Sequence, residues 1–88
     1  MGYLYMKRTV KLDLSKRIRL SAGLLDVLRY DMEVMNSAVE NYDFITVGEY
    51  IRDVNETMES LIDNLAEVEY MVYRTTTTLL KLGGEHNE

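Results

Sequence analysis

Apolar residues in the second half of this chain recur at alternating spacings of four and three residues, which restricts that half to a long helix packed along one seam. A repeat of about 3.5 residues is typical of helices that pack side by side. The chain contains no proline to interrupt it. We therefore expect a helix over residues 47–82. The series consists of Val47, Ile51, Val54, Met58, Leu61, Leu65, Val68 and Val72.

The ends of this helix carry local signals. Thr46 and Glu49 have the spacing of a capping box, in which each side chain bonds the other residue's backbone N–H. The pair Gly83-Gly84 is a common C-terminal stop. Residues 85–88 are expected to form a disordered tail.

A shorter series with the same repeat comes before it. Ser21 is placed to N-cap a helix over residues 21–42. Two seamed helices make a hairpin, and the apolar residues beside the seam expose too much surface for a monomer. We therefore expect a homodimer or tetramer, with both series except Val47 and Tyr42 in its core. The shorter series consists of Leu25, Leu28, Met32, Met35, Val39 and Tyr42.

The N-terminal segment, residues 3–20, alternates between apolar and polar side chains. Val10, Leu12 and Leu14 fall on one face of an extended chain. Period two with apolar and β-branched residues indicates a strand. Residues 13–16 fit either a turn between two short strands or the start of a helix, and both readings stay open.

The whole chain indicates one small domain over residues 1–84, mostly α with a short N-terminal β segment. It has no cysteine, and its one histidine is His86. Metal sites, cofactors and Ser/His/Asp catalysis are therefore not expected, and the chain is not predicted to be an enzyme. No apolar run reaches the roughly 18 residues that span a bilayer. We expect a cytoplasmic protein that does not bind membranes.

The charge is divided by position. Residues 1–20 contain six basic residues and one acidic residue, whereas residues 21–88 contain four basic and fourteen acidic residues. A short basic segment can bind nucleic acid locally even when the body is acidic. The alternative is that these charges protect a sheet edge or pair with the acidic helices.

The segment 44–54 resembles the start of the second helix in ribbon-helix-helix DNA-binding proteins, which often carry Ser-Glu-x-Ile-Arg there. Glu49, Ile51 and Arg52 match this pattern, and Gly48 stands at the usual serine. In that family two basic strands pair into a ribbon that enters the major groove, and the second helix's N-terminus grips phosphate. Both helices of this chain are longer than the family's.

The resemblance implies a double-stranded DNA site. Either Arg17 with Arg19 or Lys7 with Lys11 would face the groove, depending on which segment forms the ribbon. The residues expected at the site are Lys7, Lys11, Lys16, Arg17, Arg19, Thr46, Val47 and Gly48.

Two functions follow. The first is a dimeric DNA-binding transcriptional regulator with a basic strand in the major groove. An antitoxin, which joins such an N-terminus to a helix that blocks a toxin, is a variant of it. The second is a helical interaction protein without enzymatic activity, such as an adaptor, an inhibitor or a virus-type structural component. Its acidic helices would bind a protein partner.

Overall fold

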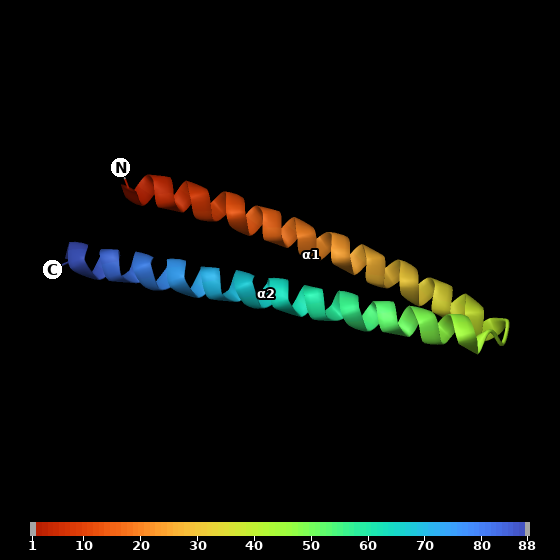
Figure 1. Ribbon diagram of the computed structural model, residues 1–88. Coiled ribbons are helices and arrows are strands. Elements are labelled where there is room, and N and C mark those ends of the chain that lie inside the picture. The colour runs from red at the N-terminus through yellow and green to blue at the C-terminus, as the bar shows by residue number, and fades with distance from the viewer. Residues whose placement is uncertain (1, 88) are drawn as a thin grey trace.

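The computed structural model describes the backbone of residues 2–87 and the side chains of residues 7–81. It contains two helices, α1 (Gly2–Glu40) and α2 (Phe44–Asn87), joined by a short loop. The helices run antiparallel and side by side, and both chain ends lie at the same end of the rod (Figure 1). The rod measures 68 × 17 × 15 Å. The expected helical hairpin is therefore confirmed.

The expected N-terminal strand is wrong, and with it the ribbon-helix-helix fold. Residues 3–20 continue α1 as helix, and the described residues contain no strand. The segment is rich in Leu, Lys and Arg, which are strong helix formers. Val10, Leu14 and Arg17 are also spaced by four and three residues, so the alternating pattern concealed a helical one. Because α1 is continuous there, Ser21 lies inside the helix and caps nothing.

The loop after α1 is a Schellman motif centred on Tyr42. The backbone N–H of Asp43 donates to the carbonyl of Ala38 at 2.8 Å, and that of Tyr42 donates to the carbonyl of Val39 at 3.0 Å. Tyr42 has a φ of 57°, the left-handed conformation that usually selects glycine at this position. These bonds satisfy the last carbonyls of α1 and turn the chain back on itself.

Asp43, and not Thr46, caps α2. The backbone N–H of Thr46 donates to Asp43 Oδ1 at 3.2 Å, and the Thr46 hydroxyl donates to Asp43 Oδ2 at 2.6 Å. Both bonds favour the carboxylate, so the pKa of Asp43 lies below 3.8, with the hydroxyl bond as the larger cause. The helix therefore begins at Phe44, three residues before the sequence-based boundary.

The helix α2 also extends further than expected. It passes through Gly83-Gly84 and the first residues of the expected tail to Asn87, and Glu88 lies outside the described residues. Glycine lowers helix propensity by about 1 kcal/mol but leaves the backbone N–H free to bond, unlike proline. Two glycines therefore do not force a helix to end.

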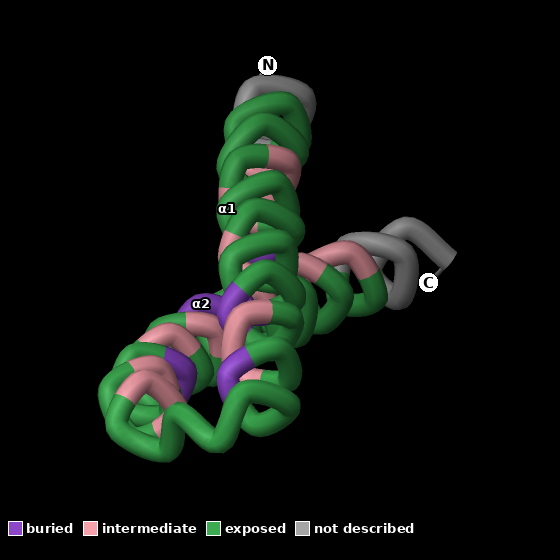
Figure 2. Tube along the Cα trace, turned by 90° about the vertical axis from the view of Figure 1, so that its right-hand side faces the viewer, coloured by how far each residue is buried: buried purple, intermediate pink, exposed green. Residues whose placement is uncertain are grey.

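Little of the molecule is buried. Exposed segments cover most of both helices, and the few buried positions face the other helix (Figure 2). Among the described residues, the buried apolar side chains are Leu28, Ala38 and Val54, and only Val54, at 2% exposed, is almost completely buried. A core of this size is small for a chain of this length.

Replacing Leu28 tests whether the buried contacts between α1 and α2 hold the hairpin together. Leu28→Ala removes a side chain that is 9% exposed. We expect it to lower the free energy of unfolding by roughly 2–3 kcal/mol, through lost burial and the cavity left behind. The matched control is Leu12→Ala, at a side chain that is 62% exposed. Thermal unfolding followed by circular dichroism compares them, and equal effects would contradict this role of the buried contacts.

The Asp43 cap predicts a loss of stability in acid. Because the folded pKa is lowered, the stabilisation is present above pH 3.8 and is lost as the pH falls through the folded pKa. Asp43→Asn keeps a capping oxygen without this titration. Below pH 3.8, melting temperatures should therefore fall less in the variant than in the parent chain. Parallel pH profiles would show that Asp43 does not contribute.

Candidate interaction surface

The two helices meet along positions that repeat every seven residues, which we call the hairpin seam. Seam residues recur at spacings of three and four in both helices, as in an antiparallel coiled coil. The α1 side of the seam is Val10, Leu14, Arg17, Ser21, Leu24, Leu28, Asp31, Met35 and Ala38. The α2 side is Val47, Tyr50, Val54, Thr57, Leu61, Asn64, Val68, Met71, Thr75 and Thr78.

The seam contains a polar layer at its middle. The amide Nδ2 of Asn64 donates to the backbone carbonyl of Arg17 and to the hydroxyl of Ser21, both at 2.7 Å. Arg17 Nη1 donates back to Asn64 Oδ1 at 3.4 Å. Ser21 and Asn64 are buried. A buried polar residue that bonds only one arrangement fixes the register of a coiled coil. Asn64 therefore sets α2 level with residues 17–21 of α1.

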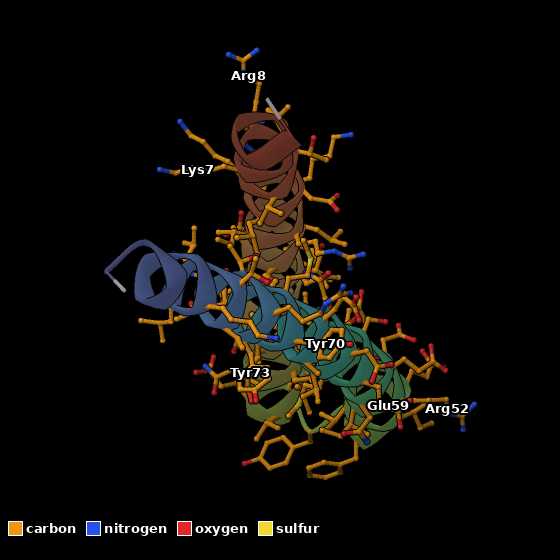
Figure 3. The ribbon with its side chains drawn as sticks, turned by 90° about the vertical axis from the view of Figure 1, so that its left-hand side faces the viewer. Lys7, Arg8, Arg52, Glu59, Tyr70 and Tyr73 are labelled. Carbon is orange, nitrogen blue, oxygen red and sulfur yellow. The ribbon has the colours of Figure 1, made fainter. Side chains whose placement is uncertain are left out.

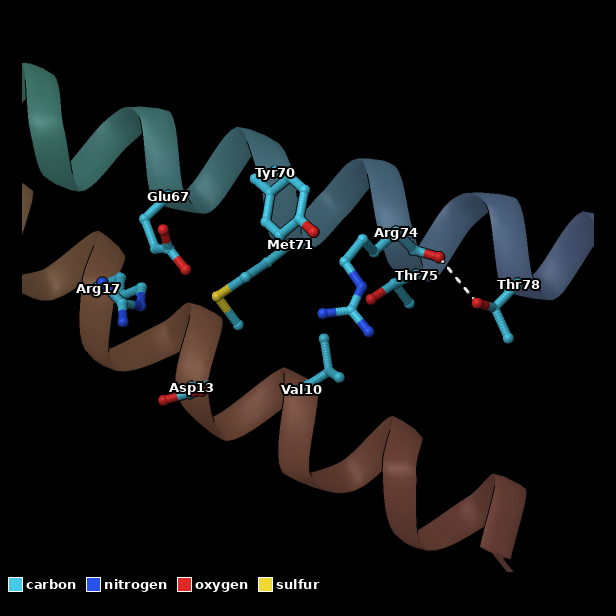
Figure 4. A pocket seen from close by; sticks show the side chains of 9 residues that line it. All are labelled: Val10, Asp13, Arg17, Glu67, Tyr70, Met71, Arg74, Thr75 and Thr78. Atoms are coloured by element: carbon cyan, nitrogen blue, oxygen red, sulfur yellow. Dashed lines mark hydrogen bonds between the residues drawn. The ribbon is translucent and has the colours of Figure 1, made fainter.

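Beyond this layer the helices diverge toward the chain ends and leave a groove between them (Figure 4). Met71 reaches from α2 toward α1, and Arg74 extends beside the ring of Tyr70, with its guanidinium carbon 5.7 Å from the ring centre. Arg17 Nε is buried at the groove edge without a hydrogen-bond partner. The groove is lined by both charged and apolar side chains, so it does not select one class of ligand.

A continuous apolar face runs beside the seam. Apart from Phe44, each member directly follows a seam residue, and every member is between 41% and 64% exposed. In an antiparallel pair, positions that follow the seam in this way lie on the same side of both helices. The apolar face is Ile18, Leu25, Met32 and Val39 of α1 with Phe44, Ile51, Met58, Leu65 and Val72 of α2.

The opposite side of the hairpin has a different composition. There α1 presents Leu20 and Val27, but α2 presents Asp53, Ser60 and Glu67 at the corresponding positions. An apolar strip against a charged one is a poor surface for continuous apolar packing. The hairpin is therefore apolar on one long side only.

The residues that the sequence predicted for the dimer core are divided between the hairpin seam and this face. The members within the hairpin seam are Leu28, Met35, Val54, Leu61 and Val68. The remaining seven belong to the apolar face and are exposed in the single chain: Leu25, Met32, Val39, Ile51, Met58, Leu65 and Val72. The series predicted from the sequence therefore combined residues of the seam with residues of the apolar face. Their place in a dimer core stays a prediction.

The charge of the hairpin is divided along its length. The half nearer the loop, residues 22–61, carries nine acidic and two basic residues, a net charge of −7. The other half, residues 7–21 and 62–81, carries four acidic and eight basic residues, a net charge of +4. Arg52 and Glu59 point outward in the loop half, and Lys7 and Arg8 lie at the opposite end (Figure 3).

The expected DNA site is divided between the two ends. Lys7, Lys11, Lys16 and Arg19 are exposed on α1 in the basic half, on different sides of the helix. Arg17 is partly buried in the seam, where it bonds Asn64. The remaining three positions lie beside the loop, at the far end of the rod: Thr46, Val47 and Gly48.

Other kinds of site receive no support from the geometry. Within the described residues, no group of three or more His, Cys, Asp or Glu side chains could hold a metal ion. Neither helix, over the same residues, has a stretch apolar and long enough to cross a membrane. The protein class that the fold defines is an antiparallel two-helix coiled coil. Comparisons with protein families, curated proteins and solved structures find no match for this chain.

The polar layer could not be predicted from the spacing of apolar residues, because Arg17, Ser21 and Asn64 are polar. Their spacing held the signal. Arg17 and Ser21 continue the three-and-four series between Leu14 and Leu28, and Asn64 does so between Leu61 and Val68. A polar residue in step with a seam is a candidate for a register-setting contact.

Removing the Asn64 amide tests the polar layer. Asn64→Ala leaves the Ser21 hydroxyl without its donor and Arg17 without its acceptor. Because both partners sit in the seam, we expect the free energy of unfolding to fall by about 1–3 kcal/mol. Asn55→Ala, at an exposed position of α2, is the matched control and should change it by less than about 0.5 kcal/mol. Equal thermal stabilities would remove the layer's structural role.

Proposed function

We propose that this protein is a helical interaction module whose apolar face binds helical segments of a protein partner. The observation that supports this proposal is the face itself: nine large apolar side chains, all more than 40% exposed, on one side of both helices. Contiguous exposed apolar surface of this extent marks protein-binding surfaces in soluble proteins.

The spacing of the face favours a helical occupant. Its residues recur every seven positions on each helix, which is the period at which a further helix can remain in contact along the whole length. An extended peptide places side chains at period two and would match only isolated positions. A compact ligand would need a cavity, and this face is a long open surface.

The seam supports the same function. Many of its positions are polar, including Arg17, Ser21, Asp31, Thr57 and Asn64. The face beside it is uniformly apolar through nine positions. Burying that face would remove nine large apolar side chains from water, so association would add to the protein's stability.

DNA binding stays a prediction from the charge of residues 1–20. The basic residues now lie on a helix, so the ribbon that would have entered the major groove is not proposed. The salt dependence of binding to a mixed-sequence duplex, between about 50 and 200 mM, measures any phosphate-dominated affinity that this helix has.

A photo-crosslinking amino acid at position 58 tests the interaction module. Met58 belongs to the apolar face, and Glu56 lies about 200° away around the same helix, because each residue turns the helix by about 100°. With the crosslinker in place of Met58, irradiation should join the protein to another polypeptide chain. The same amino acid in place of Glu56 should give little product. Absence of crosslinks from position 58, at concentrations where the chain is folded, would overturn the proposal.

A further inference from the structure

We propose that the apolar face is covered by a second copy of this chain, packed with its loop at the opposite end, to form an antiparallel four-helix dimer. This inference rests on the proposed function of the face and names its occupant. Three properties of the hairpin carry it: the area of the face, the symmetry of its repeat, and the division of charge along its length.

The area is sufficient for a stable dimer. The hairpin is 68 Å long and 17 Å wide. The apolar face extends over residues 44–72 of α2, about 42 Å at 1.5 Å per residue. At the width of the rod it offers roughly 700 Å² to a partner, within the roughly 600–1,000 Å² per partner of stable interfaces. Because both helices carry the apolar stripe, a partner that covers it fully must present two helices over the same length. A second copy meets this requirement without any further component.

The seven-residue repeat of the face allows a two-fold axis near the middle of the rod. The Asn64 contacts with Arg17 and Ser21 fix which residues of α1 and α2 lie level. At that register a two-fold axis across the rod passes midway between Ile18 and Leu25 on α1. The same axis passes midway between Met58 and Leu65 on α2. The α2 stripe from Ile51 to Val72 is therefore centred on this axis, whereas on α1 the axis lies within the N-terminal part of the stripe from Ile18 to Val39. A two-fold axis at this level makes each copy present the same positions to the other, as a self-complementary interface requires.

Near its centre this axis pairs apolar positions with apolar positions. Ile18 lies level with Leu25 of the second copy, and Met58 lies level with Leu65 of the second copy. Further out, Ile51 meets Val72 of the second copy. Lys11 lies level with Met32 of the second copy, and the position level with Val39 falls outside the side chains that the structure describes. The aliphatic stem of Lys11 covers the Met32 side chain of the second copy while its ammonium group stays in solvent.

The residues closest to the axis fit it as well. Ala22 on α1 and Ile62 on α2 flank the apolar face at the level of the axis, and both are exposed in the single chain. The equivalent flanking positions one repeat away are polar: Ser15 and Arg29 on α1. Apolar character on the flank therefore occurs where two copies would approach each other symmetrically.

Charge selects the antiparallel arrangement over the parallel one. With loops at opposite ends, the half of net charge −7 lies against the half of net charge +4 of the second copy. With loops at the same end, two halves of −7 would lie together. Like charges at close range disfavour association. The division of charge between the two halves thus favours one orientation of the dimer.

Measurement of molar mass tests the presence of a second copy. Sedimentation equilibrium of the full chain should give twice the 10.3 kDa of one chain. Met58→Glu places a charge on the apolar face and should shift the mass toward one chain, whereas Glu56→Gln on the opposite side should not. A monomer at all concentrations would overturn this inference. Crosslinks from position 58 to a different protein would still support the interaction module, so the two proposals fail separately.

Single cysteines test the orientation, because the chain contains no cysteine of its own. In the antiparallel dimer, Ala22→Cys and Ile62→Cys should each join to the same residue of the second copy on oxidation or with a short thiol crosslinker. The matched controls are Leu20→Cys and Ser60→Cys, two residues earlier on the opposite side of each helix. The controls should remain uncrosslinked, and these variants leave the apolar face intact.

Two other results would overturn the arrangement. Crosslinking only in a mixture of Ala22→Cys and Ile62→Cys chains would place the loops at the same end, because there α1 lies over α2 of the second copy. Crosslinking of Leu20→Cys or Ser60→Cys, without crosslinking at positions 22 and 62, would place the second copy on the opposite side of the hairpin.

Discussion

The hairpin depends on a repeat of seven residues that both helices keep in step. The Schellman turn at Tyr42 and the Asp43 cap bring α2 back beside α1, and the Asn64 contacts hold the two repeats at one register. Once the period and the register are fixed, each of the remaining residues lies on a defined side of the rod. The seam, the apolar face and the charged halves all follow from that placement.

The seam and the apolar face differ in chemistry and have different roles: the seam fixes the register, and the face offers apolar surface for burial. A seam that contains Arg17, Ser21 and Asn64 contributes less apolar burial than an aliphatic one, but it accepts few alternative registers, since each shift would leave buried polar groups unpaired. The apolar face has the opposite properties, because it offers large burial with little directional bonding. The seam specifies the hairpin, and the apolar face would stabilise the proposed association.

Much of the fold could be predicted from the sequence. The repeat from Val47 to Val72 and the shorter series from Leu25 to Tyr42 predicted the hairpin. The N-terminal helix could not be separated from a strand, because Val10, Leu12 and Leu14 satisfy period two while Val10, Leu14 and Arg17 satisfy the helical period. The residues of the apolar face could be predicted as apolar positions, but they could not be separated from the seam. Two stripes one residue apart form a single apolar series until the position of the partner helix is known.

Folding and association are coupled in such a molecule. If a second copy binds only the folded hairpin, the free energy of unfolding rises with protein concentration by mass action. Because only three apolar side chains are buried among the described residues, burial of the apolar face in the proposed dimer would add substantially to the stability of the hairpin. The interaction surface is then also a source of stability, and a partner that displaced the second copy would have to replace that burial along the whole rod.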